Sequence, residues 1–289
     1  MKRRPCQAGS FYEADAGSCG RTAKEMIDAA ALPADLPEEL FGGVVPHAGW
    51  VFSGRTAALT LKALAERGRL GRVVLFGADH WGVGDGAAVY DKGSWETPLG
   101  EVAVDEQLAA ALLEACPLLR SDDRAHAREH SLEVQLPLMR MLREDVRIVP
   151  VTVPPDERAV EVGSAVGKVL KESFPEASVV GSTDLTHYGP QYSFTPGGVG
   201  AGGLAWATEN DRRLLELIES MQSEKIIDET SSRMNACGGG ALAAAMAACS
   251  TMGAARGLLL EYTTSAEVMK KAFRAAASDA VGYAAVVFA

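Results

Sequence analysis

Three of the chain's five histidines lie just after short apolar runs that have the composition of buried strands. The runs at residues 43–46, 73–76 and 179–180 lead into His47, into His80, and into the segment that holds Asp184 and His187. In open α/β sheets, ligands bind beyond the carboxyl ends of the strands. If these strands are parallel neighbours, the four side chains converge on one pocket that could hold a metal or transfer protons. A core or capping role for each histidine is the alternative.

Cys237 lies just before an alanine-rich run, residues 241–248, which is predicted to be helical because alanine has the highest helix propensity. A thiol at a helix N-terminus lies at the positive end of the helix dipole, which is expected to lower its pKa toward the metal-binding thiolate. A buried structural role is the alternative, and it is the role expected for Cys249 in the same helix. The five cysteines are scattered and form no C-x-x-C pair, which indicates reduced thiols in a cytoplasmic protein.

A second histidine pattern, from His126 to His130, matches the H-x-x-E-H signature of inverted zinc peptidases. The polar residues just before it argue against a helix that spans both histidines, and so short a motif arises easily by chance. We therefore expect His126 to lie in a charged, solvent-exposed loop and not to bind metal. Ser131 is predicted to cap a helix with Glu133 in its first turn. Glu129 and His130 would then lie in the entering loop, free to face the pocket.

The chain as a whole alternates short apolar runs with longer amphipathic ones. Predicted strands lie at residues 43–46, 72–76, 87–90, 146–151, 178–181, 257–262 and 282–288. Predicted helices lie at residues 54–66, 105–114, 131–142, 156–172, 204–219 and 238–249. This alternation predicts an α/β fold, a single domain over residues 1–289, in which helices flank a mostly parallel central sheet.

Composition narrows the class of protein. The 289 residues are 47% hydrophobic but only 6% aromatic, which is ordinary for an α/β enzyme with an aliphatic core. The formal charge of −10 argues against nucleic acid or an anionic membrane as a partner. No apolar run approaches the ~20 residues needed to span a bilayer, and the N-terminus lacks the apolar stretch of a signal peptide. A cytoplasmic protein is expected.

At these motifs the sequence resembles the Memo family, known in prokaryotes as AmmeMemoRadiSam system protein B. The resemblance extends over essentially the whole chain and rests on seven short motifs in order. They are Ala8-Gly9-Ser10-Phe11-Tyr12, Pro46-His47-Ala48-Gly49-Trp50, Gly77-Ala78-Asp79-His80, Thr97-Pro98-Leu99-Gly100, Glu129-His130-Ser131-Leu132-Glu133, Asp184-Leu185-Thr186-His187 and Cys237-Gly238.

The resemblance implies a fold related to the class III extradiol dioxygenases, which are non-haem iron enzymes. It implies that His47, His80 and Cys237 bind the metal, with Asp184 and His187 as catalytic groups beside it. The third ligand in the dioxygenases is a carboxylate, so a cysteine departs from their pattern. Two histidines and a thiolate suit Fe(II), which we expect, and also copper or zinc.

These observations favour a metal-dependent oxidoreductase, resembling the dioxygenases, that acts on a small-molecule substrate. A non-catalytic protein that binds a peptide or another ligand in the same pocket is one alternative, and a zinc-dependent hydrolase is another. The family name associates the chain with AMMECR-type and radical SAM proteins, which are the partners that the resemblance implies.

Overall fold

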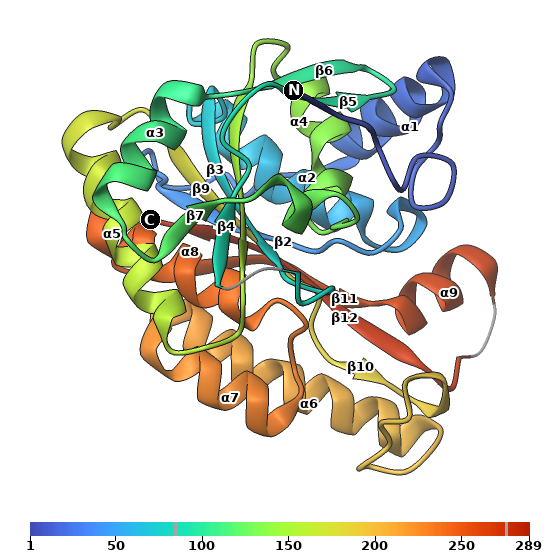
Figure 1. The fold of residues 1–289 in the computed structure, drawn as a ribbon. Helices are drawn as coiled ribbons and strands as arrows, with labels where there is room; N and C mark the ends of the chain where they lie inside the picture. The colour runs from blue at the N-terminus through green and yellow to red at the C-terminus, as the bar shows by residue number, and fades with distance from the viewer. Residues whose placement is uncertain (84–85, 275–276) are drawn as a thin grey trace.

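The computed structural model describes residues 1–83, 86–274 and 277–289, and its central feature is a twisted sheet with helices on both faces (Figure 1). The middle of the sheet is parallel, in the order β6 (Gly100–Val104), β8 (Arg147–Val153), β3 (Arg72–Ala78), β9 (Ser178–Ser182) and β2 (Gly42–Val45). Next to β2, the antiparallel strand β12 (Ala280–Phe288) pairs also with β10 (His187–Tyr188) and β11 (Gly257–Thr264). The predicted α/β fold with a mostly parallel central sheet is therefore confirmed.

Four short strands complete the sheet: β1 (Lys2–Arg3), β4 (Ala87–Val89), β5 (Ser94–Thr97) and β7 (Leu119–Ser121). The helices are α1 (Ala16–Ala29), α2 (Trp50–Glu66), α3 (Glu106–Ala115), α4 (Leu136–Leu142), α5 (Arg158–Ser173), α6 (Ala201–Glu219), α7 (Ile226–Arg233), α8 (Gly239–Met252) and α9 (Ser265–Phe273). Within the described ranges, no helix combines the length and the apolarity needed to cross a membrane.

The central strands are apolar on both sides because each faces a layer of helices. Side chains alternate along a strand, so Val73 and Leu75 of β3 join the core under α1, α2 and α4. Val74 and Phe76 of the same strand join the core under α3, α5 and α8 (Figure 1). This double burial explains why the strand runs are continuously hydrophobic in the sequence.

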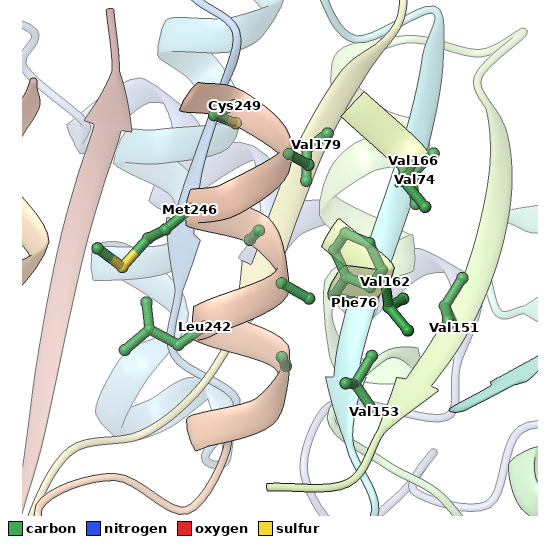
Figure 2. Close-up of a cluster of buried hydrophobic side chains, with 14 of the residues drawn as sticks. Val74, Phe76, Val151, Val153, Val162, Val166, Val179, Leu242, Met246 and Cys249 are labelled. Carbon is green, nitrogen blue, oxygen red and sulfur yellow. The ribbon is translucent and has the colours of Figure 1, made fainter. Parts of the chain in front are cut away.

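Helix α8 is buried along almost its whole length and packs against both α5 and the sheet, in a core that includes valines of both (Figure 2). Its small alanines allow α5 to approach closely. A Cβ atom added to Gly163 of α5 would lie only 2.2 Å from the carbonyl oxygen of Ala244. The alanine-rich sequence of α8 therefore fixes the position of the segment before it, which carries Cys237.

The helix predicted at residues 131–142 starts later than expected. The segment at 131–142 begins with a 3-10 turn, Glu133–Gln135, and α4 starts only at Leu136. Ser131 does not cap it, because its hydroxyl accepts a hydrogen bond from the backbone N–H of Ala78 at 3.1 Å. Ser131 therefore hydrogen-bonds to the end of β3 instead of to the first turn of a helix.

Candidate metal centre

Three neighbouring strands bring the site residues together. β2 lies beside β9, and β9 lies beside β3, all parallel, so their carboxyl ends meet at one edge of the sheet. His47 follows β2, His80 follows β3 and Asp184 follows β9. The backbone N–H of His47 donates to Asp184 Oδ1 at 2.7 Å, which ties the first loop to the third. The placement of these histidines after strands is thus what puts them in one place.

Three imidazoles form a cluster at this edge. The potential ligand nitrogens of His47, His80 and His130 all lie within 4.8 Å of one another. The ring centroids of His80 and His130 are 4.6 Å apart and nearly stacked, whereas His47 meets each of them edge-on at 5.3 Å. Metal–nitrogen bonds are ~2.0–2.1 Å long, so only small side-chain movements would let the three rings share one ion.

The hydrogen bonds of His47 place its ring proton on Nδ1. His47 Nδ1 lies 2.9 Å from Ser182 Oγ, and the same hydroxyl lies 2.8 Å from the carbonyl oxygen of Ser131. A hydroxyl has one proton, and a carbonyl can only accept, so the network assigns the proton on Nδ1 to His47. The lone pair on Nε2 is then available to a metal. Burial lowers the pKa of His47 well below its usual value, which keeps this ring neutral.

His80 is oriented by a buried carboxylate. Glu129 Oε1 accepts a hydrogen bond from His80 Nδ1 at 2.9 Å, and Glu129 Oε2 accepts one from the backbone N–H of His80 at 3.0 Å. Burial alone would raise the pKa of Glu129, but its bonds with His80 lower that pKa to about 2. Burial alone would lower the pKa of His80, yet its bonds with Cys237 and Glu129 raise it to about 10. Glu129 is fully buried behind His80, whereas His130 lines the open cleft.

Cys237 lies against the histidine cluster. Its Sγ is 3.2 Å from His47 Nε2, and its backbone N–H donates to the carbonyl oxygen of Asp184 at 3.2 Å. The lowered pKa expected from the sequence is wrong: burial raises the pKa of this thiol above its usual value, although its contact with His80 acts in the opposite direction. Gly238 is the N-cap of α8, so the thiol lies outside the first turn of the helix and gains little from the helix dipole.

Asp184 and His187 lie beside the cluster, with Asp184 Oδ2 4.0 Å from His187 Nε2. Burial raises the pKa of Asp184 to about 7. Burial, and then the charge of His80, lower the pKa of His187 to about 4. Among the described residues, His187 Nε2 has no hydrogen-bond partner. A carboxyl group that titrates near neutral pH and an unpaired imidazole are suited to moving a proton to or from a bound molecule.

These side chains form one end of a cleft of about 640 Å³. His47, His80, His130, Asp184 and His187 contribute to its lining. The remaining wall is largely apolar and includes the rings of Phe11, Phe52, Tyr192 and Tyr283. A cleft of this size accepts a small molecule or a single side chain.

His126 was expected to be solvent-exposed, and this is wrong. Its ring is completely buried, packs edge-on against Tyr90 and Trp95, and places Nε2 3.0 Å from the carbonyl oxygen of Ala88. The 3-10 turn Asp123–His126 ends at this residue, so it shares no helix with His130. The buried guanidinium of Arg3, which donates to the backbone carbonyl of His126 at 2.7 Å, helps to hold this loop inward. The geometry of a zinc-peptidase helix is absent from this segment.

Two asparagines that the sequence analysis missed connect the loops of the site. Asn210 on α6 donates to Thr186 Oγ1 at 3.1 Å, beside His187, and to the carbonyl oxygen of Arg233 at 3.0 Å. Asn235, two residues before Cys237, donates to the carbonyl oxygen of Asn210 at 3.0 Å. No motif marks Asn210, because its partners are distant in the sequence.

Comparisons with known proteins agree on a family. A family described as Memo-like protein matches residues 3–287. A MEMO1 family protein of Methanopyrus kandleri is 39% identical to this chain, over 100% of it and 99% of the relative. One from Thermococcus onnurineus is 38% identical, again over 100% of this chain and 99% of the relative.

One solved structure supports the fold alone. The crystal structure of uncharacterized protein JW3007 from Escherichia coli K12 superposes with a TM-score of 0.55 at 12% identity, covering 87% of this chain and 100% of that one. The architecture is consistent with a fold like that of the class III extradiol dioxygenases, as the sequence resemblance implied.

Proposed function

Because this chain belongs to the Memo family, we propose that it is a metal-dependent oxidoreductase that acts on a small molecule in the cleft. The observation that carries the proposal is the cluster of His47, His80 and His130, which lines that cleft and whose ligand nitrogens lie within 4.8 Å of one another. Such a cluster suits a metal ion, because imidazole nitrogens this close together can converge on one ion, whereas charging all three rings would place like charges side by side.

We assign the metal-binding roles to His47, His80 and Cys237, with His130 as a neighbouring donor. Ser182 and Glu129 support this assignment, because they hold the Nδ1 protons of the two histidines and leave both Nε2 atoms for the ion. A set of two imidazoles and a thiolate fits Fe(II), and it also accepts copper or zinc. Three protein ligands leave coordination positions open, as catalytic sites require.

The side chains around this set bind and orient the substrate. Bound Fe(II) would supply the redox chemistry. His187 Nε2 would accept or donate a proton at the substrate, and the Asp184 carboxyl group, 4.0 Å away, would exchange protons with it. The aromatic wall excludes water from the reacting atoms.

The test begins with protein purified without air, its metal content measured, and oxygen uptake screened with small substrates. His80→Ala should lower iron affinity by more than about 100-fold, because it removes a metal ligand, whereas loss of a partner that only orients a ligand costs about 10-fold to 100-fold. His187→Ala removes an imidazole from the same cleft and should retain iron while losing turnover. Equal iron affinity in the two variants and the parent protein would contradict the proposal.

Two further outcomes would favour the other functions considered for this cleft. Zinc that co-purifies and supports hydrolysis without oxygen would favour a hydrolase. A metal-loaded protein that binds a ligand but turns nothing over would favour a binding protein. We further propose a cytoplasmic location, consistent with free thiols at all five cysteines, and AMMECR-type and radical SAM proteins as partners. Co-purification from the native host would test those partners.

A further inference from the structure

The charges that line the cleft are unbalanced. Its described lining includes the carboxylates of Asp184 and Asp279 but no lysine or arginine. Proteins bind carboxylate and phosphate groups chiefly with arginine, lysine or helix N-termini. Beyond the metal ligands, an anionic ligand would therefore meet no charged partner here. The formal charge of −10 on the whole chain acts in the same direction, because it draws cations toward the protein and repels anions.

Asp279 lies at a defined place relative to the histidines. Val281 and Tyr283 are alternate residues of β12, Asp279 immediately precedes that strand, and all three line the cleft. Val281 lies opposite His187 in the antiparallel pair of β10 and β12. Asp279 is thus the diagonal neighbour of His187, at a spacing of ~7–8 Å in such a pair. Its carboxylate marks a second polar position on the cleft wall, near His187 rather than among the metal-binding side chains.

The carboxylate of Asp279 has local partners but keeps acceptor capacity. Oδ1 accepts the backbone N–H of Gln191 at 2.8 Å, and Oδ2 accepts the hydroxyl of Ser278 at 2.6 Å. Two carboxylate oxygens offer about four acceptor positions, so both can bind a further donor. The bonds from Ser278 and Gln191 also hold the pKa of Asp279 below its usual range, so the group is charged at neutral pH. No salt bridge joins it to a cation within the described residues.

Much of the remaining cleft wall is apolar. Phe52, Met269, Tyr192 and Tyr283 line it, and Tyr192 packs 5.0 Å from the ring of His187. Aromatic faces attract both flat rings and ammonium groups. A cleft wall that combines apolar rings, a carboxylate and a metal-binding cluster fits a ligand with matching parts.

We propose that the cleft takes a small amine: a molecule with a flat, apolar body, a metal-binding end and an ammonium group that pairs with Asp279. This inference rests on the proposed function for the metal-binding end only. The preference for an ammonium group at Asp279 belongs to the cleft wall, so the comparison of tyramine with neutral 4-ethylphenol applies to metal-free protein too. The comparison with 4-hydroxyphenylacetate applies to metal-loaded protein only, because metal-free His80, whose pKa is raised to about 10, adds a positive charge to the cleft.

Three matched phenols test the inference by calorimetric titration of zinc-loaded protein, in which zinc replaces iron without redox chemistry. Tyramine carries an ammonium group, 4-ethylphenol is neutral, and 4-hydroxyphenylacetate carries a carboxylate. Tyramine should bind at least about threefold more tightly than 4-ethylphenol, since a partly exposed charged hydrogen bond contributes that much. The carboxylate should bind most weakly.

Asp279→Asn preserves the shape of the side chain and its bond with Gln191. It should remove the preference for tyramine over 4-ethylphenol while leaving the affinity for 4-ethylphenol within about twofold. The order of affinity of the three ligands for the parent protein tests the proposal even if this variant does not fold. Equal binding of tyramine and 4-hydroxyphenylacetate, an unchanged order in the variant, or no binding of any of the three overturns the inference.

The titrations of tyramine and 4-ethylphenol on metal-free protein separate the two proposals. A protein that fails to bind metal but still prefers tyramine over 4-ethylphenol would overturn the proposed function and support the amine inference. A protein that binds metal at His80 but shows no preference among the three ligands would support the proposed metal site and overturn the amine inference.

Discussion

At the scale of single residues, the site depends on which proton each small group holds. The Ser182 hydroxyl donates its only hydrogen bond to the carbonyl oxygen of Ser131, so it accepts a hydrogen bond from His47 Nδ1–H. The backbone thereby sets the orientation of a metal-binding ring through one hydroxyl group. Partners of this kind typically change metal affinity by 10-fold to 100-fold when they are removed.

Ser182→Ala should therefore weaken metal binding by about 10-fold without unfolding the protein. Ser178 provides a matched control, because it lies on the same strand and its hydroxyl also donates to a backbone carbonyl, that of Arg69 at 2.7 Å. Ser178→Ala removes a similar bond far from the cluster and should leave metal affinity unchanged. Metal titration of both variants, with thermal unfolding as a check on folding, decides the matter. An equal loss of metal affinity in the two variants would mean that Ser182 affects only the stability of the fold.

Cys237 is a second test at this scale. Its Sγ lies 3.2 Å from His47 Nε2, whereas Cys249 is buried within α8. Cys237→Ser should lower metal affinity by more than about 10-fold, because a hydroxyl is a poor substitute for a thiolate ligand. Cys249→Ser should leave metal affinity unchanged and lower only stability. Because burial raises the pKa of the Cys237 thiol, alkylation of the metal-free protein should be slow at pH 7 and accelerate at higher pH. Metal binding unaffected by Cys237→Ser would shift the third ligand role to His130.

At the scale of elements, the contact between α5 and α8 holds the Cys237 segment in place. A Cβ added to Gly163 would meet the Ala244 carbonyl oxygen at 2.2 Å, so the helices would have to move apart. Gly163→Ala should destabilise the protein by about 1–3 kcal/mol, although alanine favours helices. Gly202 on α6 has no atom within 4 Å of an added Cβ, so Gly202→Ala should be neutral or slightly stabilising. Urea unfolding measures the stability of each variant. Equal changes in the free energy of unfolding would argue against tight packing of α5 against α8.

At the scale of the whole molecule, stability should depend on pH through Asp211. This carboxyl group on α6 accepts hydrogen bonds from the backbone N–H of Thr186 and from the Tyr262 hydroxyl, both at 2.8 Å. Burial raises its pKa to about 6, from an ordinary value of 3.8. The folded protein therefore holds this proton more tightly than the unfolded chain does. The stability that this proton provides is present at low pH and is lost as pH rises toward and through 6.

Asp211→Asn removes that dependence. From pH 5 to pH 8, the free energy of unfolding of the variant should rise by about 1 kcal/mol relative to the parent protein. Asp228→Asn, at an exposed site on α7, removes the same charge without a buried carboxyl group and serves as the control. Urea unfolding at both pH values provides the measurement. A difference between variant and parent that does not change with pH would show that Asp211 is not protonated in the folded state.

Much of the fold could be predicted from the sequence because strand and helix patterns are local. Each of the seven predicted strands corresponds to an observed one, within about two residues at most ends. The short strands β1, β5, β6, β7 and β10 were not predicted, because each depends on a partner elsewhere in the chain rather than on its own pattern. The helix that begins after Ser131 was misplaced for the same reason, since the Ser131 hydroxyl bonds to β3 instead of capping a helix.

The sequence by itself determined the family, the α/β class and the position of His47 and His80 after apolar runs. These features depend on residue type and short spacing, which the linear chain contains in full. Only the tertiary structure decided that His126 is buried, that the pKa of Cys237 is raised and that Ser182 and Glu129 orient the two metal-binding rings. Each of these depends on desolvation or on a hydrogen bond between residues 49 or more positions apart, such as His80 with Glu129 or His47 with Ser182. The order of strands in the sheet creates those contacts, and no local pattern records it.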